Sequence, residues 1–352
     1  CIRDRVYVGA ASILRRRQET YFNPWRAYAY VVLLIAILLS SGGGIPQLIA
    51  LYASVISLAA IAWKTRSMVD MGLAAVFFLW PFHSTLDQIN IAPQGYALGY
   101  IVLALAFYFP LGWYLERRRQ LQARIFQFIG YSLAALAVVY STLCDIDMFF
   151  ESFDWVSFTV PLLATVLCAL SSYAYRSKWF AWVSSLTLFI TLWFFFELVN
   201  IRSSYIIVSW MGAAILQLIA ACGLQALIRR QEMDWLEFFD RPLTYAAWVQ
   251  AGLSVSLALP SILNSLLAID PTLTRSPEYL APILITLGSG IIFLLIAVWV
   301  QKSHLPLYLE PPLALGFVIF LSMISAEQIL GTGLTTLHYM LITSIVGLVH
   351  WC

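Results

Sequence analysis

The chain has 352 residues, of which 61% are hydrophobic and only 11% are charged. Soluble domains carry about 25% charged residues, so this composition excludes an ordinary soluble globular protein. The formal net charge is only +2 at pH 7, which argues against nucleic acid as a partner because such proteins present strongly basic surfaces. The partner that the composition does predict is the lipid bilayer.

The apolar residues fall in blocks of about 18 to 24, the length that an α-helix needs to cross roughly 30 Å of hydrocarbon. These blocks predict an all-α, polytopic transmembrane helical bundle of about twelve spans. The expected spans are 27–43, 46–63, 69–83, 95–115, 125–144, 157–175, 179–199, 205–228, 243–266, 279–301, 313–330 and 334–352. A basic segment, 1–26, precedes the transmembrane domain, 27–352, and we expect both to be part of a longer chain.

The lysines and arginines support this span count and predict an orientation. With twelve spans, all 20 basic residues except Arg202 and Arg275 fall on the side of the N-terminus. A wrong number of spans would scramble this separation. Since basic residues gather on the cytoplasmic side of membrane proteins, we expect both termini to be cytoplasmic, and the chain to lie in the inner membrane if its source is bacterial.

The connections suggest that the bundle is built from six helical hairpins. Basic connections recur at intervals of roughly 50 to 70 residues, as in a repeat of one supersecondary unit. The odd-numbered spans from the third onward also end at the outer face in an acidic residue: Asp87, Asp145, Glu197, Asp270 and Glu327. The alternative interpretation is an ordinary alternation of helices and loops without a repeat.

Glu327 and His338 form a candidate polar pair inside the membrane. They flank the Gly331–Gly333 turn at similar distances, so the two residues lie at similar depth in an antiparallel hairpin. A desolvated glutamate beside a histidine is suited to proton relay or ion binding. The alternative is that both side chains are wetted, or form an interhelical hydrogen bond.

The densest acidic cluster is predicted to face outward after the fifth span. Its members are Asp145, Asp147, Glu151 and Asp154. The Asp-Ile-Asp motif resembles that of polytopic glycosyltransferases that use lipid-linked sugars, and the resemblance implies carboxylates that hold a divalent metal beside a phosphate. In that family the motif belongs to the first outer loop, whereas here it follows the fifth span. We therefore expect a solvated acidic loop, without a metal ion or cofactor.

Several other residues of the chain are predicted to have structural roles rather than functional ones. Polar residues within the spans are expected to hydrogen-bond between helices: Gln217, Gln250, Asn264 and Ser265. Glu197 is expected to pair with Arg202, and Gly288-Ser289-Gly290 to mark a close helix contact. The segment 231–241 predicts a short helix lying flat in the headgroup layer. The five cysteines have no metal-ligand spacing.

Three classes of function are compatible with these patterns, and no P-loop, HExxH or GxSxG motif occurs in the sequence. The favoured class is a membrane-embedded subunit or membrane anchor, whose partners are other membrane subunits or further domains of the same chain. A secondary transporter would need a polar cavity near Gln217, Gln250 or Glu327. An enzyme acting at the outer face on a lipid-linked substrate would depend on the acidic cluster.

Overall fold

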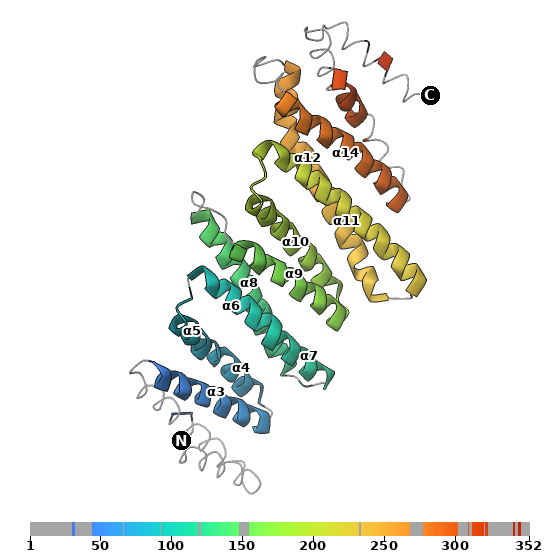
Figure 1. Ribbon diagram of the computed structural model, residues 1–352. Coiled ribbons are helices and arrows are strands. Elements are labelled where there is room, and N and C mark those ends of the chain that lie inside the picture. Colours follow the sequence, from blue (N-terminus) through green and yellow to red (C-terminus); the bar gives the residue numbers. More distant parts are fainter. Residues whose placement is uncertain are drawn as a thin grey trace. The chain divides into compact units, whose positions relative to one another are not determined.

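The computed structural model of the protein describes most of residues 44–301 (Figure 1). The described residues are 30–31, 44–65, 67–91, 93–118, 120, 122–147, 155–231, 234–267, 277–301, 309, 312–319, 321–322, 341 and 344–345. These residues are almost entirely helical and include no strand. The all-α class is therefore confirmed for the part of the chain that the structure describes.

The chain divides into two compact units, Cys1–Phe150 and Glu151–Cys352. The elements of the first unit are α3 (Ile45–Thr65), α4 (Met68–Phe77), α5 (Leu79–Gln88), α6 (Pro93–Leu103), the π-helix η1 (Ala104–Tyr108), α7 (Phe109–Arg117) and α8 (Ala123–Asp147). Those of the second unit are α9 (Trp155–Tyr175), α10 (Lys178–Leu198), α11 (Ser203–Gln231), the 3₁₀-helix η2 (Asp234–Leu236), α12 (Glu237–Leu267) and α14 (Pro277–Gln301).

Within the described residues, eight helical segments are long and apolar enough to cross a bilayer. They are Ile45–Trp63, Met68–Gln88, Gly95–Arg117, Ala123–Leu143, Trp155–Tyr175, Lys178–Leu198, Ser204–Ile228 and Leu280–Val300. Helices of this length and composition are consistent with a multi-pass membrane protein, and they overlap eight of the twelve expected spans.

The remaining four expected spans have different outcomes. The one at 243–266 lies within α12, which is helical but is not among the eight apolar segments. Those at 27–43, 313–330 and 334–352 lie largely outside the described residues. A total of twelve spans and the cytoplasmic location of the termini therefore stay predictions.

The second of these segments is two helices joined at Phe78. The expected span, 69–83, is too short, because His83 and Thr85 look like the end of an apolar block, whereas α5 continues to Gln88. The hydroxyl of Thr85 donates to the Pro81 carbonyl at 2.7 Å and lies 2.9 Å from the Tyr52 hydroxyl of α3. Polar residues can extend this helix because their hydrogen bonds are made inside the protein.

A π-helical turn interrupts the third segment just before Pro110. A proline has no N–H and cannot bond to the carbonyl four residues earlier, and a wider turn accommodates this. Tyr108, in the π-turn, is fully buried and donates its hydroxyl to the Ala75 carbonyl of α4 at 2.7 Å. Gly130 of α8 makes room for it, since a Cβ there would lie 2.9 Å from the Tyr108 Cβ.

In the second unit, α9 packs along α10, and α11 packs along both α12 and α14 (Figure 1). The Ser184 hydroxyl of α10 donates to the Thr165 carbonyl of α9 at 3.2 Å, and the Ser254 hydroxyl of α12 donates to the Ile207 carbonyl of α11 at 2.6 Å. A cluster of buried apolar residues fills the space between α11, α12 and α14: Met211, Ala214, Leu218, Ala247, Ala251, Phe293, Leu294, Ala297 and Val300.

Two local predictions in the second unit have different outcomes. The close contact at Gly288 and Gly290 is confirmed, because a Cβ on Gly288 would lie 3.0 Å from the ring of Phe317. The segment 231–241 is not a separate helix in the described residues, and its position in the headgroup layer stays a prediction. After α11 ends, η2 turns the chain directly into α12, and Trp235 packs edge-on against Tyr173 of α9 with ring centroids 4.9 Å apart.

Two helix ends, those of α5 and α10, close with the same hydrogen-bond pattern. Asn90 and Asn200 have positive φ, 55° and 57°. Each N–H bonds to the carbonyl of the acidic residue three positions earlier, Asp87 or Glu197, and the next residue bonds back five positions. This is the Schellman motif with asparagine in the left-handed position. The six-hairpin repeat as a whole stays a prediction.

The packing of Tyr108 on Gly130 can be tested with a matched pair of substitutions. Gly130→Ala should lower the free energy of unfolding by about 1–3 kcal/mol, because its Cβ meets an anchored side chain. A Cβ added at Gly212 of α11 meets nothing within 4 Å. Gly212→Ala should therefore raise the free energy of unfolding by about 0.5–1 kcal/mol, since alanine favours the helix more than glycine does. Denaturant unfolding in bicelles measures both, and equal effects would contradict the packing described here.

Candidate functional site

One polar cluster of the first unit lies where α5 and α6 meet, at one end of their spans. We call it the His83 cluster, and its members are His83, Asp87, Tyr96 and Tyr100. His83 and Asp87 lie one turn apart on α5, with Nε2 and Oδ2 separated by 3.7 Å and side chains 47% and 52% exposed. The cluster therefore combines an imidazole, a carboxylate and two phenols that are half open to their surroundings.

The two tyrosines of α6 hold the polar groups of α5 in place. Tyr96 donates its hydroxyl to Oδ1 of Asp87, and the Tyr100 hydroxyl lies 2.9 Å from Nδ1 of His83. The His83 ring also stacks on Tyr100, with an interplanar angle of 10°. An acidic residue near a helix C-terminus interacts unfavourably with the helix dipole. We therefore attribute the position of Asp87 to its hydrogen bond with Tyr96 of α6.

Gln217 and Gln250 are the second candidate, and they lie inside the second unit. Gln217 is 7% exposed and Gln250 is fully buried. The amide oxygen and nitrogen of both side chains have no hydrogen-bond partner among the described residues. The prediction that these two residues hydrogen-bond between neighbouring helices is therefore wrong. An unbonded buried amide costs about 1–3 kcal/mol.

The two glutamines lie at similar depth on adjacent antiparallel helices. Gln217 is close to the midpoint of the span Ser204–Ile228. Contacts from Ser254 to Ile207, at 2.6 Å, and from Gln225 to Asp240, at 2.8 Å, set the register of α11 and α12. With a rise of 1.5 Å per residue, this register separates Gln217 and Gln250 by roughly 3 to 9 Å along the helix axes.

The other candidate residues mostly lie beyond what the structure describes. Asp145 and Asp147 belong to the last turn of α8, but their side chains are outside the described ones. The side chains of Asn264 and Ser265, in α12, are also outside those described. The remaining candidates lie outside the described residues altogether: Glu151, Asp154, Asp270, Glu327 and His338. The Glu327–His338 pair and the acidic cluster stay predictions. So does the Glu197–Arg202 ion pair, although the helix end that carries Glu197 is described above.

Sequence reasoning missed Asp70 and the tyrosine partners of the His83 cluster. Asp70 is 1% exposed in the first turn of α4, where its N–H donates to the Ser67 hydroxyl at 3.4 Å. The signal was Ser-x-x-Asp before an apolar block, which marks a helix start. Tyr96 and Tyr100 have helical spacing, but no sequence pattern pairs them with α5.

Within the described residues, no group of three or more His, Cys, Asp and Glu could hold a metal ion.

No family model, curated protein or solved structure matches this chain.

Replacing Gln250 tests whether its amide is truly unbonded. Gln250→Met keeps the length of the side chain and removes both polar atoms, so the free energy of unfolding should rise by about 1–3 kcal/mol. The matched control is Gln225→Met, which loses a hydrogen bond to the Asp240 carboxylate and should be destabilised by about 1 kcal/mol. Destabilisation by Gln250→Met, measured by the same unfolding assay, would mean that a water molecule or a solute bonds to the amide.

Proposed function

We propose that the chain is a membrane-embedded subunit or membrane anchor of a larger assembly, with no catalytic activity of its own. The observation that supports this proposal is the close packing at mid-depth of the second unit. There, Met211, Ala214 and Leu218 of α11 pack into one apolar cluster with residues of α12 and α14. A helical domain whose described middle is packed with apolar side chains in this way is suited to holding a position in the bilayer.

The residue types of this cluster explain why the packing is close. Ala214, Ala247, Ala251 and Ala297 are buried where the helices meet, and small side chains let backbones approach each other in membranes. Several hydroxyl groups of the spans bond to nearby carbonyls. The hydroxyls of Thr165 and Thr286, for example, donate within their own helices at 2.8 Å.

The outward surface offers large apolar side chains to lipids or to the spans of a partner. Phe128, Trp179 and Trp299 are 74%, 80% and 73% exposed. Such residues need no partner in a bilayer, because lipid chains surround them as well as another helix would. The partner surface is therefore to be found by experiment on the intact assembly rather than from exposure alone.

A secondary transporter is the second candidate, and Gln217 and Gln250 favour it. Polar groups buried in a membrane span are costly and often mark a solute or ion path. Two unbonded amides at similar depth are such groups. This candidate requires water or a solute at the amides, so the Gln250→Met experiment discriminates between the two functions.

The subunit proposal predicts a stable complex. When the chain is tagged at its own genomic locus and purified in a mild detergent, native mass spectrometry should find it bound to at least one other polypeptide in a fixed ratio. An unrelated multi-span protein, tagged and purified in the same way, controls for carry-over. Recovery of the chain only as a monodisperse monomer would contradict the proposal.

Orientation can be tested with two single cysteines in a background that lacks the five native ones. Gln88 ends one span and Arg118 directly follows the next, and both are exposed. A membrane-impermeant maleimide should label Gln88→Cys on intact cells, and Arg118→Cys only after permeabilisation, because the basic end should face the cytoplasm. The reverse pattern would show that the orientation is inverted.

A further inference from the structure

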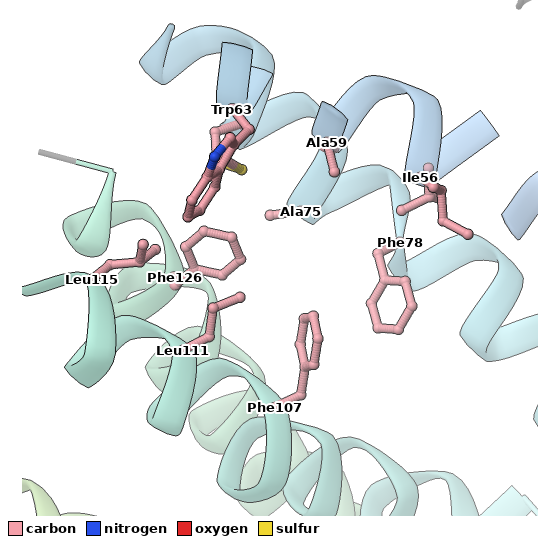
Figure 2. A pocket seen from close by; sticks show the side chains of 12 residues that line it. Ile56, Ala59, Trp63, Ala75, Phe78, Phe107, Leu111, Leu115 and Phe126 are labelled. Carbon is pink, nitrogen blue, oxygen red and sulfur yellow. The ribbon is translucent and has the colours of Figure 1, made fainter. Parts of the chain in front are cut away.

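An apolar cavity opens in the first unit between α3, α4, α7 and α8. Its volume is about 320 Å³, within the range of small-molecule sites in proteins. Its lining is made by Val55, Ile56, Ala59, Trp63, Met71, Ala74, Ala75, Phe78, Phe107, Leu111, Leu115 and Phe126. Figure 2 shows the side chains of Trp63, Phe78, Phe107 and Phe126 around a common hollow.

The interruptions of the spans shape this cavity. Phe78, at the break between α4 and α5, stacks on Phe107 of the π-turn with ring centroids 5.1 Å apart. Ala59 and Ala75 contribute only methyl groups from α3 and α4, which leaves the space between the rings unfilled (Figure 2). The lining offers almost no polar atoms, and an apolar cavity of this kind stays dry.

The cavity is open sideways at the depth of the hydrocarbon. Ile56, Trp63 and Phe107 line it and yet are 67%, 54% and 40% exposed. These residues belong to the spans Ile45–Trp63 and Gly95–Arg117. At this depth, the medium outside the mouth of the cavity consists of lipid acyl chains.

Two arginines follow the lining residues of α7, at the end of the span where a lipid headgroup would be. Arg117 and Arg118 follow the lining residue Leu115 by about 3 to 5 Å along α7. The guanidinium group of Arg117 lies 4.1 Å from the centroid of the Trp113 ring, and that of Arg118 lies 4.8 Å from the centroid of the Tyr114 ring. Aromatic rings at span ends mark the headgroup layer, and basic residues there attract anionic lipids.

Glu116 offsets only part of this positive charge. Glu116 lies between the two arginines in sequence, but its carboxylate accepts a hydrogen bond from Nε2 of Gln127 in α8 at 2.6 Å. Arg124, in the first turn of α8, adds a third exposed basic residue at the same end of the unit. The end of the cavity therefore combines an apolar slot with a cationic rim.

We propose that this cavity binds one acyl chain of an anionic phospholipid from the leaflet at the arginine end, with its phosphate held by Arg117 and Arg118. The inference uses only residues of the first unit. It does not depend on the function proposed above, because a subunit, an anchor or a transporter can each carry a bound lipid.

Photo-crosslinking tests the position of the acyl chain. The purified chain is placed in phosphatidylcholine vesicles that contain a phosphatidylglycerol with a diazirine in its acyl chain, and labelled peptides are mapped by mass spectrometry. Labelling is expected at Ile56 and Phe107. Ala59→Phe should fill the cavity and reduce this labelling about tenfold, the fold-change that corresponds to 1.4 kcal/mol. Ala53→Phe, an exposed position of α3 outside the lining, should leave it unchanged.

The headgroup is tested with the same probe carried on phosphatidylcholine instead. The native chain should prefer the phosphatidylglycerol probe, and Arg117→Gln with Arg118→Gln should weaken that preference about fivefold per arginine. Arg241→Gln, an exposed basic position in the second unit, is the control.

If the cavity-filling variant Ala59→Phe fails to fold, Ala75→Leu replaces it. Undiminished labelling in the filled variants, or equal labelling by the two headgroups, would overturn the proposal.

Discussion

The constraint on which this structure depends is that a peptide group inside hydrocarbon must find its hydrogen-bond partner within the protein. The helices meet most of this requirement alone. On either side of the break at Phe78, side chains add bonds to helix carbonyls: Tyr108 of the π-turn bonds to the Ala75 carbonyl of α4, and Thr85 to the Pro81 carbonyl of α5. The breaks therefore lie where helices of the first unit pack together, and the apolar cavity forms beside them.

The same constraint divides the polar side chains into two groups. Hydroxyls such as those of Thr165 and Ser254 are short enough to reach a carbonyl of their own or a neighbouring helix. A glutamine amide has two donors and an acceptor on a longer side chain, and a tightly packed helix leaves no free carbonyl for it. Gln217 and Gln250 are thus two points, among the described residues of the second unit, where packing and hydrogen bonding conflict.

Much of the fold was predictable from the sequence, because block length and charge placement report directly on the bilayer. Local exceptions were less predictable. The span ending at Gln88 was set too short, since a sequence does not reveal that Tyr52 lies opposite Thr85. The bond from Tyr96 to Asp87 and the cavity both depend on how helices dock, which apolar periodicity does not encode. The glutamines were misjudged because a polar residue in a span usually finds a partner.

The packing of α11 has a consequence for how the chain is made. Its neighbour in sequence, α10, contacts it far less than α12 and α14 do, and both of these are synthesised later. The surface of α11 that carries Met211, Ala214 and Leu218 is thus completed only after both α12 and α14 have left the ribosome. The pair α9 and α10 can therefore pack before α11 acquires its main neighbours.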